Sequence, residues 1–312
     1  MRGFFQTYNY IIIKGMDTMK LINGKARATQ LQKQYKRAVQ LLKEQDIQPK
    51  MQVITVGNDP ASQVYVTQKE KTAKKIGIAF EWVKLNEQAT QEELLQLIQK
   101  TNEDPTIHGV IVQLPLPQHL DSQEVMGTID PRKDIDGFHP YNVGRLMLGD
   151  ETLVPCTPRG IVNLLDEYNI TIPGADVAII GRSKIVGQPL ANLLINRGAT
   201  VSVLASRTKD IQYYTQHADI VVVAVGKAHL IDKTYLKEGA VVIDVGINRL
   251  DNGKLVGDVD FNSAKDVVGS ITPVPGGVGP MTVAMLMEQA IVCTCQQMGV
   301  DVQKLLKEAL DD

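Results

Sequence analysis

The 312-residue sequence contains only three cysteines, a small and odd number that provides no disulfide framework and fits a reducing compartment. It has no CxxC pair and no HExxH segment, so no metal site is predicted. The formal net charge of −2 favours neither nucleic acid nor an anionic membrane surface. No apolar run is expected to span a bilayer. These absences predict a cytoplasmic protein with no nucleic-acid or membrane partner.

The length and composition of the chain predict two domains. The sequence is 44% hydrophobic and 22% charged, and it is long enough for each domain to bury a core. Polar residues at 149–151 place the boundary near residue 150. Residues 1–15 lack the long apolar region and small-residue cleavage site of a secretory signal, so we expect either a dispensable N-terminal extension or a translation start assigned too early. The first domain is then expected over 16–150 and the second over 151–280.

Strand and helix patterns alternate through the first domain. Strands are predicted over 51–56, 80–85 and 109–112, with helices over 26–45, after Pro60 and after Thr90. Asp59 is a plausible N-cap before Pro60, and Thr90 with Glu93 forms a capping box. The order βαβαβ predicts a parallel sheet with right-handed crossovers, and therefore an α/β fold.

The helix after Pro60 carries the first candidate site. Ser62, Tyr65 and Lys69 are spaced to share one helix face. This face follows the carboxyl end of a strand, where open α/β sheets bind ligands. An amine in a partly apolar pocket there exchanges protons near neutral pH, which makes Lys69 the main acid/base candidate. A solvated helix surface with an incidental tyrosine fits this stretch equally well when it is considered alone.

Two polar loops add further candidates. Gln113 ends the third strand, beside the strand that precedes the Lys69 helix, and begins a loop stiffened by alternate prolines. The charged, turn-rich segment 130–140 contains Asp136, which is suited to accept from the N–H groups of a heterocycle. His139 and Cys156 are weaker candidates, because a single residue of either type in a loop is usually structural. A solvated connector is the simpler reading of such loops.

The second domain shows the pattern of a dinucleotide-binding half. Strands are predicted over 176–180, 200–204, 220–225 and 240–245, with helices over 190–197, up to His217 and near 233–237. The turn after the first of these strands has glycines at 181 and 187, so it only half matches the GxGxxG fingerprint. Its helix N–H groups favour a phosphate, to which Arg182 and Ser183 add donors. A tight turn with a basic surface is the simpler alternative.

The residues after the second strand of this domain distinguish NADP from NAD. An NAD site places an acidic residue here, whereas this chain has Ser206 and Arg207. A hydroxyl and a guanidinium suit a 2′-phosphate, so the predicted cofactor is NADP.

Together these segments resemble the bifunctional methylenetetrahydrofolate dehydrogenase/methenyltetrahydrofolate cyclohydrolase family. The resemblance covers about residue 21 to beyond 291 and is carried, in family order, by PASQVYVTQK (60–69), QLPLP (113–117) with DIDG (134–137), GRSKIVGQP (181–189) and TPVPGGVGPMT (272–282). It implies two three-layer α/β domains, the second a Rossmann-type NADP-binding domain, with a folate cleft between them. It also implies that a C-terminal helix over 281–312 completes the first domain, and that the chain forms a homodimer. One-carbon metabolism, including purine, histidine and methionine biosynthesis, is the implied context.

The resemblance also implies residue roles. Lys69 would be the catalytic lysine, Tyr65 would pack against the folate, Gln113 would set the protonation of the lysine, and Asp136 would hold the pterin. The remaining implied folate contacts are Ser62, Leu114, Pro275, Gly276, Gly277, Val278 and Gly279. The implied NADP contacts are Gly181, Arg182, Ser183, Ser206, Arg207 and Ile247.

Three other functions compete with this prediction. A monofunctional folate dehydrogenase would carry the same motifs. A nucleotide-sensing module with a degenerate site would be expected to lack Lys69, Gln113 or Asp136, and all three are present. A Rossmann dehydrogenase for a small hydroxy acid would leave Tyr65, Lys69 and the Pro-Gly-Gly loop unexplained.

Overall fold

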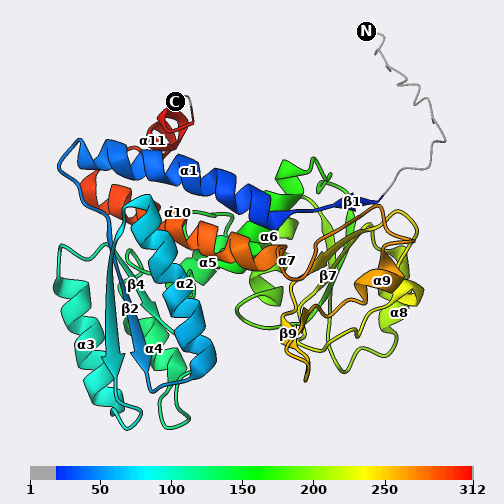
Figure 1. The fold of residues 1–312 in the computed structure, drawn as a ribbon, viewed down its shortest axis with the longest axis horizontal. Coiled ribbons are helices and arrows are strands. Elements are labelled where there is room, and N and C mark those ends of the chain that lie inside the picture. The colour runs from blue at the N-terminus through cyan, green and yellow to red at the C-terminus, as the bar shows by residue number, and fades with distance from the viewer. Residues whose placement is uncertain (1–18, 311–312) are drawn as a thin grey trace.

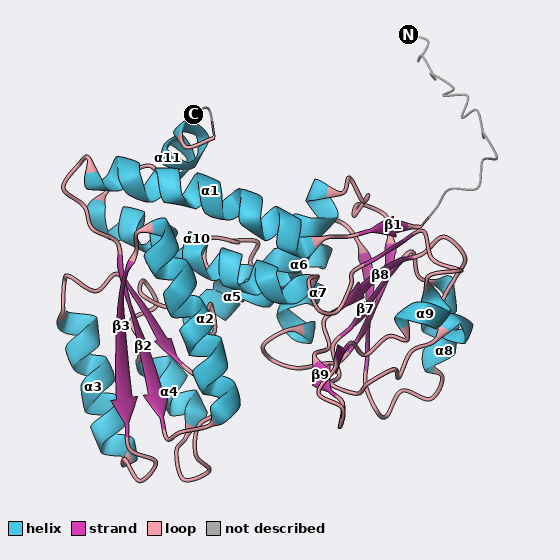
Figure 2. Ribbon diagram, viewed as in Figure 1, coloured by secondary structure: helices cyan, strands magenta, loops and turns pink. Residues whose placement is uncertain are grey.

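The computed structural model describes residues 19–310 and shows two α/β domains connected by long helices (Figures 1 and 2). The expected extension over 1–15 lies outside the described residues. In Figure 1 the first domain contains β2–β4 and the second contains β7 with its neighbouring strands. The α/β fold expected from the sequence is confirmed, while the exact domain limits stay a prediction.

The sheet of the first domain has three parallel strands in the order β3-β2-β4. Its strands are β2 (Lys50–Val56), β3 (Ala79–Leu85) and β4 (Gly109–Val112), and its short elements include α3 (Gln91–Glu103) and α4 (Ser122–Thr128). The central strand β2 is buried from Met51 to Val56, since helices cover both faces of the sheet. Parallel sheets covered on both faces read as continuous apolar runs, which is why the three strands were predictable.

Helix α2 (Pro60–Ile76) starts and ends as its sequence predicts. The Asp59 side chain accepts a 2.7 Å hydrogen bond from the Ser62 N–H, and Pro60 occupies the first turn. Gly77 ends the helix in the left-handed region at φ 93°, which a glycine adopts without steric penalty. Both features fix α2 directly after β2, so its first turns lie at the carboxyl end of the sheet.

The sheet of the second domain has six parallel strands in the order β1-β11-β8-β7-β5-β6. The strands are β1 (Lys20–Leu21), β5 (Asp176–Ile180), β6 (Thr200–Leu204), β7 (Ile220–Val223), β8 (Val241–Asp244) and β11 (Ser270–Ile271). The connecting elements are α7 (Gly187–Asn196), α8 (Ile211–His217), the 3-10 turn η1 (Lys233–Tyr235), the hairpin of β9 (Asn248–Arg249) with β10 (Leu255–Val256), and α9 (Phe261–Ala264). The predicted strand–helix alternation is confirmed here as well.

Strand β1 departs from the expected division of the chain. Residues from 16 onward were expected in the first domain, but Lys20 and Leu21 pair with β11 in the second sheet. The Lys20 N–H donates to the Gly269 carbonyl at 2.9 Å, and the Ile22 N–H donates to the Ile271 carbonyl at 2.8 Å. Two-residue strands carry no periodicity, so the sequence pattern could not reveal this pairing.

Long helices lie side by side across the molecule (Figure 1). They are α1 (Gly24–Lys43), α6 (Cys156–Glu167) and α10 (Val278–Met298), with the shorter α5 (Pro140–Met147) and α11 (Val302–Glu308) beside them. The single C-terminal helix expected over 281–312 is wrong, because Gly299 ends α10 at φ 70° and α11 begins separately. Residues 311–312 lie outside the described part of the chain.

Helix α10 also corrects the expectation that no segment is long and apolar enough to span a bilayer. Its length and composition meet that criterion, yet most of the helix is buried inside the protein. Glu288 on this helix accepts hydrogen bonds of 2.5 Å from Tyr35 on α1 and from Arg159 on α6. A buried charge paired in this way identifies α10 as a core helix that ties α1 to α6.

Candidate active site

Lys69 and Gln113 meet at the carboxyl end of the first sheet. The Lys69 Nζ donates a 3.0 Å hydrogen bond to the Gln113 Oε1. Lys69 is on α2, which follows β2, whereas Gln113 directly follows β4, and these two strands are neighbours. The Gln113 backbone N–H donates to the Ile54 carbonyl of β2 at 2.9 Å, which fixes the start of the loop. The predicted proximity of these two residues is therefore confirmed.

Tyr65 and Ser62 differ in exposure although both are on α2. The Tyr65 side chain is 48% exposed one turn before Lys69, while Ser62 is 9% exposed. An exposed ring beside an amine offers an apolar face to a flat ligand. Ser62 lies in the first turn, where its N–H is already bonded to the Asp59 cap.

Asp136 lies close enough to Lys69 for the two charges to interact. Burial raises the pKa of the Asp136 carboxyl, the positive charge of Lys69 lowers it, and the negative charge of Asp134 raises it. Among residues 19–310, the Asp136 carboxylate forms no hydrogen bond. Asp134, in contrast, accepts from the N–H groups of Gly137 at 3.1 Å and His139 at 2.8 Å, so it shapes the turn itself.

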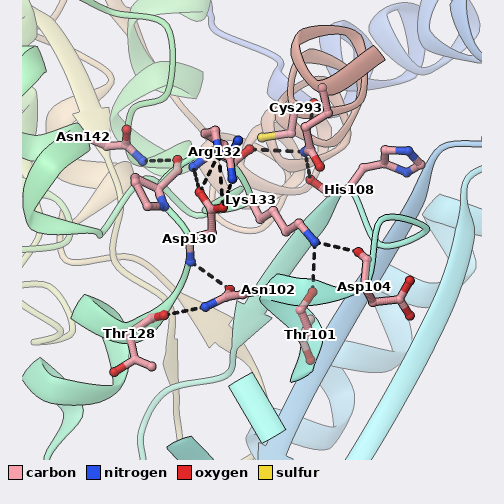
Figure 3. Close-up of polar contacts among 12 residues, drawn as sticks. Thr101, Asn102, Asp104, His108, Thr128, Asp130, Arg132, Lys133, Asn142 and Cys293 are labelled. Atoms are coloured by element: carbon pink, nitrogen blue, oxygen red, sulfur yellow. Dashed lines mark hydrogen bonds and ion pairs between the residues drawn. The ribbon is translucent and has the colours of Figure 1, made fainter. Parts of the chain in front are cut away.

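The segment before Asp136 is anchored to the first domain (Figure 3). The buried Lys133 Nζ donates to the carbonyl groups of Thr101 at 2.9 Å and Asp104 at 2.7 Å. The Asp130 N–H donates to the Asn102 Oδ1 at 2.8 Å. These bonds attach the segment to the end of α3, so Asp136 is held on a fixed loop.

A buried glutamine on α10 fastens the same loop from the other side. The Gln289 Nε2 donates to the Ile135 carbonyl at 2.6 Å and to the Cys156 Sγ at 3.3 Å, and its Oε1 accepts from the Val154 N–H at 2.8 Å. Burial, followed by the charge of Asp136, raises the pKa of the Cys156 thiol well above its usual value. Cys156 is therefore a packed, protonated thiol. The contacts of Gln289 were not predicted from the sequence, because they join residues that are far apart in the chain.

His139 has a structural position. Its Nδ1 accepts from the Tyr141 N–H at 3.0 Å, which caps the start of α5. This capping contact agrees with the prediction that His139 is a weaker site candidate, because a single histidine in a loop is usually structural.

The Pro-Gly-Gly loop packs against the start of α1. The Gly276 carbonyl accepts from the Lys25 N–H at 2.8 Å, and a Cβ added to Gly24 would lie 1.9 Å from the Gly277 carbonyl oxygen. The loop then opens α10, whose Gly279 faces Ile247: a Cβ on Gly279 would lie 3.5 Å from the Ile247 Cδ1. Within the described chain, no hydrogen bond joins residues 275–279 to Lys69, Gln113 or Asp136.

The turn after β5 in the second domain, here called the glycine turn, is tight enough to require Gly181 and Gly187. Gly181 has φ 122°, and a Cβ there would lie 2.2 Å from the Ala224 carbonyl oxygen. A Cβ on Gly187 would lie 1.9 Å from the Gly181 carbonyl oxygen. The Ser183 Oγ accepts from the N–H groups of Val186 at 3.1 Å and Gly187 at 3.4 Å. Two glycines therefore suffice for a close backbone approach, which fits the diphosphate of a dinucleotide.

A basic hollow of about 300 Å³ lies at the end of β6. It is lined by Arg182 and by residues 205–208, which include Ser206 and Arg207. The Thr208 Oγ accepts from the Ala205 N–H at 3.0 Å. This bond stabilises the turn that carries Ser206 and Arg207. Two guanidinium groups and hydroxyls around one hollow suit a phosphate monoester.

A larger cavity of about 940 Å³ lies between the two domains. Of the predicted site residues, Leu114 and Arg182 line it, together with side chains of α4, α5 and α7. Lys69, Gln113 and Asp136 are not part of its lining. The cavity therefore extends from the loop after β4 in the first domain to the glycine turn after β5 in the second.

Two buried aspartates of the second domain were missed by the sequence analysis. Asp244 ends β8 and is 4% exposed, and Asp258 is 0% exposed. Both accept only from N–H groups, and Ile247, which lies between them in the sequence, is 47% exposed. The one available signal was an acidic residue at or near the end of an apolar strand. Acidic residues are common in loops, so this signal does not distinguish a buried aspartate from an exposed one.

Models of one protein family match both parts of the chain. The tetrahydrofolate dehydrogenase/cyclohydrolase catalytic domain matches residues 22–136, and the NAD(P)-binding domain of the same family matches residues 155–298. The bifunctional protein FolD of Streptococcus pyogenes is 52% identical over 271 residues, which are 86% of this chain and 95% of that protein.

Solved structures agree with these matches. The bifunctional FolD methylenetetrahydrofolate dehydrogenase/cyclohydrolase of Campylobacter jejuni is 48% identical, with a TM-score of 0.88, over 89% of this chain and 99% of that one. The Trypanosoma brucei methylenetetrahydrofolate dehydrogenase-cyclohydrolase, solved with NADP and an inhibitor, is 38% identical, with a TM-score of 0.86, over 90% and 98% of the two chains. With both domains matched and the Lys69–Gln113 pair and glycine turn in place, the chain belongs to the tetrahydrofolate dehydrogenase/cyclohydrolase family.

Proposed function

We propose that this chain catalyses two consecutive reactions on tetrahydrofolate derivatives. The first is the NADP-dependent oxidation of 5,10-methylenetetrahydrofolate to 5,10-methenyltetrahydrofolate, and the second is hydrolysis of that product to 10-formyltetrahydrofolate. The observation that carries the proposal is the 3.0 Å contact between Lys69 and Gln113 beside Asp136, in a chain whose second domain has a tight glycine turn after β5.

The residues of the first domain carry the proton chemistry. Water adds to the electrophilic methenyl carbon and the ring opens, which requires a proton to be moved, and Lys69 performs this transfer. The Gln113 Oε1 accepts from Lys69 and thereby sets the direction in which the amine points. Tyr65 packs its exposed ring against the folate, and Asp136 accepts from the amino edge of the pterin. Ser62 contributes to the start of this helix face.

The Pro-Gly-Gly loop completes the folate site from the other domain. Residues 275–279 open α10 beside Ile247, and Leu114 lies at the first-domain side of the 940 Å³ cavity. Placement of the methylene carbon between these elements is the main requirement of the oxidation, because hydride transfer depends on distance and alignment.

The second domain holds NADP, which supplies hydride acceptance when bound. The turn at Gly181, with Arg182 and Ser183, receives the diphosphate. Ser206 and Arg207 bind the 2′-phosphate in the basic hollow at the end of β6. Ile247 contacts the opposite end of the cofactor.

We also propose that the chain is a cytoplasmic homodimer. The three cysteines are free and buried, as expected in a reducing compartment. Strand β6 is at the edge of the second sheet, and Val203 on it and Ile195 nearby are 41% and 54% exposed. A second copy covering this edge would bury both side chains. Light scattering of the purified protein tests the proposed mass of two chains.

A coupled assay tests the two activities separately. NADPH formation from 5,10-methylenetetrahydrofolate is followed in one arm, and loss of 5,10-methenyltetrahydrofolate in the other, each with NAD and with NADP. We expect activity in both arms and a preference for NADP in the first. NADPH formation without any acceleration of 5,10-methenyltetrahydrofolate hydrolysis over the uncatalysed rate would show a monofunctional dehydrogenase. That result would refute the proposal.

A further inference from the structure

The Asp258 carboxylate accepts four hydrogen bonds from N–H groups of two separate segments. Its Oδ2 accepts from the backbone N–H groups of Val225 at 2.7 Å and Gly226 at 3.0 Å. Its Oδ1 accepts from the Lys227 N–H at 2.8 Å and from the Asn248 Nδ2 at 2.9 Å. One fully buried side chain therefore holds the turn after β7 and the segment after β8 in a fixed relation.

Asp244 places Asp258 in this position. The Asp244 Oδ1 accepts from the N–H groups of Gly246 at 3.0 Å and Asp258 at 2.9 Å, and its Oδ2 accepts from the Val259 N–H at 2.9 Å. The two aspartates form a chain of contacts from the end of β8 to the turn after β7. All seven bonds have a carboxylate oxygen as acceptor, and such bonds are stronger than those between neutral groups.

The glycines in these segments leave room for the two carboxylates. A Cβ on Gly246 would lie 2.2 Å from the Asp258 Oδ1, and a Cβ on Gly257 would lie 1.8 Å from the Asp244 Oδ2. Any other residue at either position would displace a carboxylate. The backbone here is thus shaped around Asp244 and Asp258.

The order of the strands places this pair at one end of the cofactor path. The basic hollow lies at β6, the glycine turn follows β5, and β7 and β8 come next in the sheet. An extended dinucleotide bound along the carboxyl ends of these strands therefore has its nicotinamide half over β7 and β8. Ile247 lies there, next to Gly279 of α10.

From this geometry we propose that Asp258 is a positioning residue for the nicotinamide half of NADP. Asp258 holds the backbone of 225–227 below the nicotinamide half of NADP. Through its bond with Asn248, it also fixes the neighbouring Ile247 against the Pro-Gly-Gly loop. The inference rests on the proposed function, because it takes NADP as the ligand of the second domain. It adds a residue that touches neither the phosphates nor the folate.

A comparison of whole and truncated cofactor tests the proposal. Asp258→Asn in the full chain replaces one of the two carboxylate oxygens with an NH2 group, which cannot accept from the N–H groups that it faces. We expect the affinity for NADPH, measured by isothermal titration calorimetry, to fall at least about tenfold, because the backbone of 225–227 is no longer held in place beneath the nicotinamide half. The affinity for 2′,5′-ADP, which occupies only the hollow at β6, is expected to stay within about twofold of the wild-type value. Asp251→Asn, an exposed aspartate of the same domain, is the matched control.

A general loss of structure would weaken both ligands together, so equal weakening of NADPH and 2′,5′-ADP would overturn the inference. Unchanged NADPH affinity would overturn it as well. If Asp258→Asn does not fold, Asn248→Ala removes one of the four bonds and is judged by the same two affinities. Wild-type protein that binds neither NADPH nor 2′,5′-ADP would instead refute the proposed function.

Discussion

The Lys69 Nζ donates a 3.0 Å hydrogen bond to the Oε1 of Gln113, a residue 44 positions away in sequence. The bond joins helix α2, which follows β2, to the start of the loop after the neighbouring strand β4, and Asp136 lies close enough to interact with the same amine. A neutral acceptor orients the lysine without adding a charge that would hold its proton. The pair is therefore suited to proton transfer at a fixed position.

Lys69→Met is expected to lower methenyltetrahydrofolate hydrolysis at least about 100-fold, because a thioether cannot move a proton. NADP binding should be unchanged, since the cofactor residues are all in the second domain. Stopped-flow absorbance of the methenyl substrate and calorimetry with NADP measure the two effects. Lys71→Met, on the exposed side of the same helix, is the control. Retained hydrolysis in Lys69→Met would remove the lysine from this role.

Gln113→Glu is expected to change the pH dependence of hydrolysis. A carboxylate at this position stabilises the charged ammonium of Lys69, so the hydrolysis rate at pH 7 should drop by about tenfold and recover as the pH rises. Gln113→Leu removes the acceptor without adding a charge, and it should lower the rate with no displacement of the profile to higher pH. Superimposable profiles for wild type and Gln113→Glu would contradict the role assigned to this residue.

Arg207→Ala is expected to weaken NADP far more than NAD. Loss of a charge-assisted hydrogen bond to the 2′-phosphate corresponds to about 1.5–3 kcal/mol, or a KM for NADP about 10- to 100-fold higher. The KM for NAD should change little, because NAD has no phosphate in the hollow at β6. Lys209→Ala, beyond the lining of that hollow, is the control. An equal increase in KM for NADP and for NAD would show that Arg207 does not recognise the 2′-phosphate.

Gln289→Leu is expected to destabilise the protein and to loosen the loop of Asp136. The substitution leaves the Val154 N–H buried without its acceptor, and it leaves the Ile135 carbonyl with only the 3.3 Å contact from the Cys156 thiol, at a cost of about 1–3 kcal/mol in the free energy of unfolding. Urea unfolding measures this loss, and the KM for the folate should rise as well. Met287→Leu, also buried on α10, conserves volume and should cost less than about 1.5 kcal/mol.

Asp244 is expected to make stability depend on pH. Burial raises the pKa of Asp244 from 3.8 to about 6, while N–H bonds from Val259 and Asp258 lower it and the charge of Asp258 raises it. The folded state thus binds a proton more tightly than the unfolded state, so this stabilisation is full below about pH 4 and is lost as the pH rises through about 6. Relative to Asp244→Asn, wild type should lose up to about 3 kcal/mol between pH 4 and 7, measured by urea unfolding at each pH. A constant difference across this range would contradict the assignment.

Local sequence signals predicted the elements that position Lys69. Asp59, Pro60 and Gly77 mark the start and end of α2, and all three act as expected. Thr90 and Glu93 likewise form the capping box of α3. These features depend on a few adjacent residues, so they can be read without knowledge of the fold.

The contacts that were not predicted join residues far apart in the chain. Gln289 meets Ile135 across 154 positions, and β1 pairs with β11 through two residues at each strand. The short helices α4 and α5 were missed because segments of seven and eight residues carry little periodicity. The contacts of Asp244 and Asp258 could not be predicted either, because they form only when the sheet brings the two loops together.

The pairing of β1 with the second sheet means that the chain crosses between the domains three times. The crossings follow Ile22, run from α5 to α6, and follow Thr272 into α10. Opening of the interdomain cavity must bend all three connections together, so the domains are restricted to a hinge-like rotation about them. Proteolytic cleavage near residue 150 would give two fragments that each contribute to both domains, through β1 and through α10, so the fragments are expected to stay associated by noncovalent contacts.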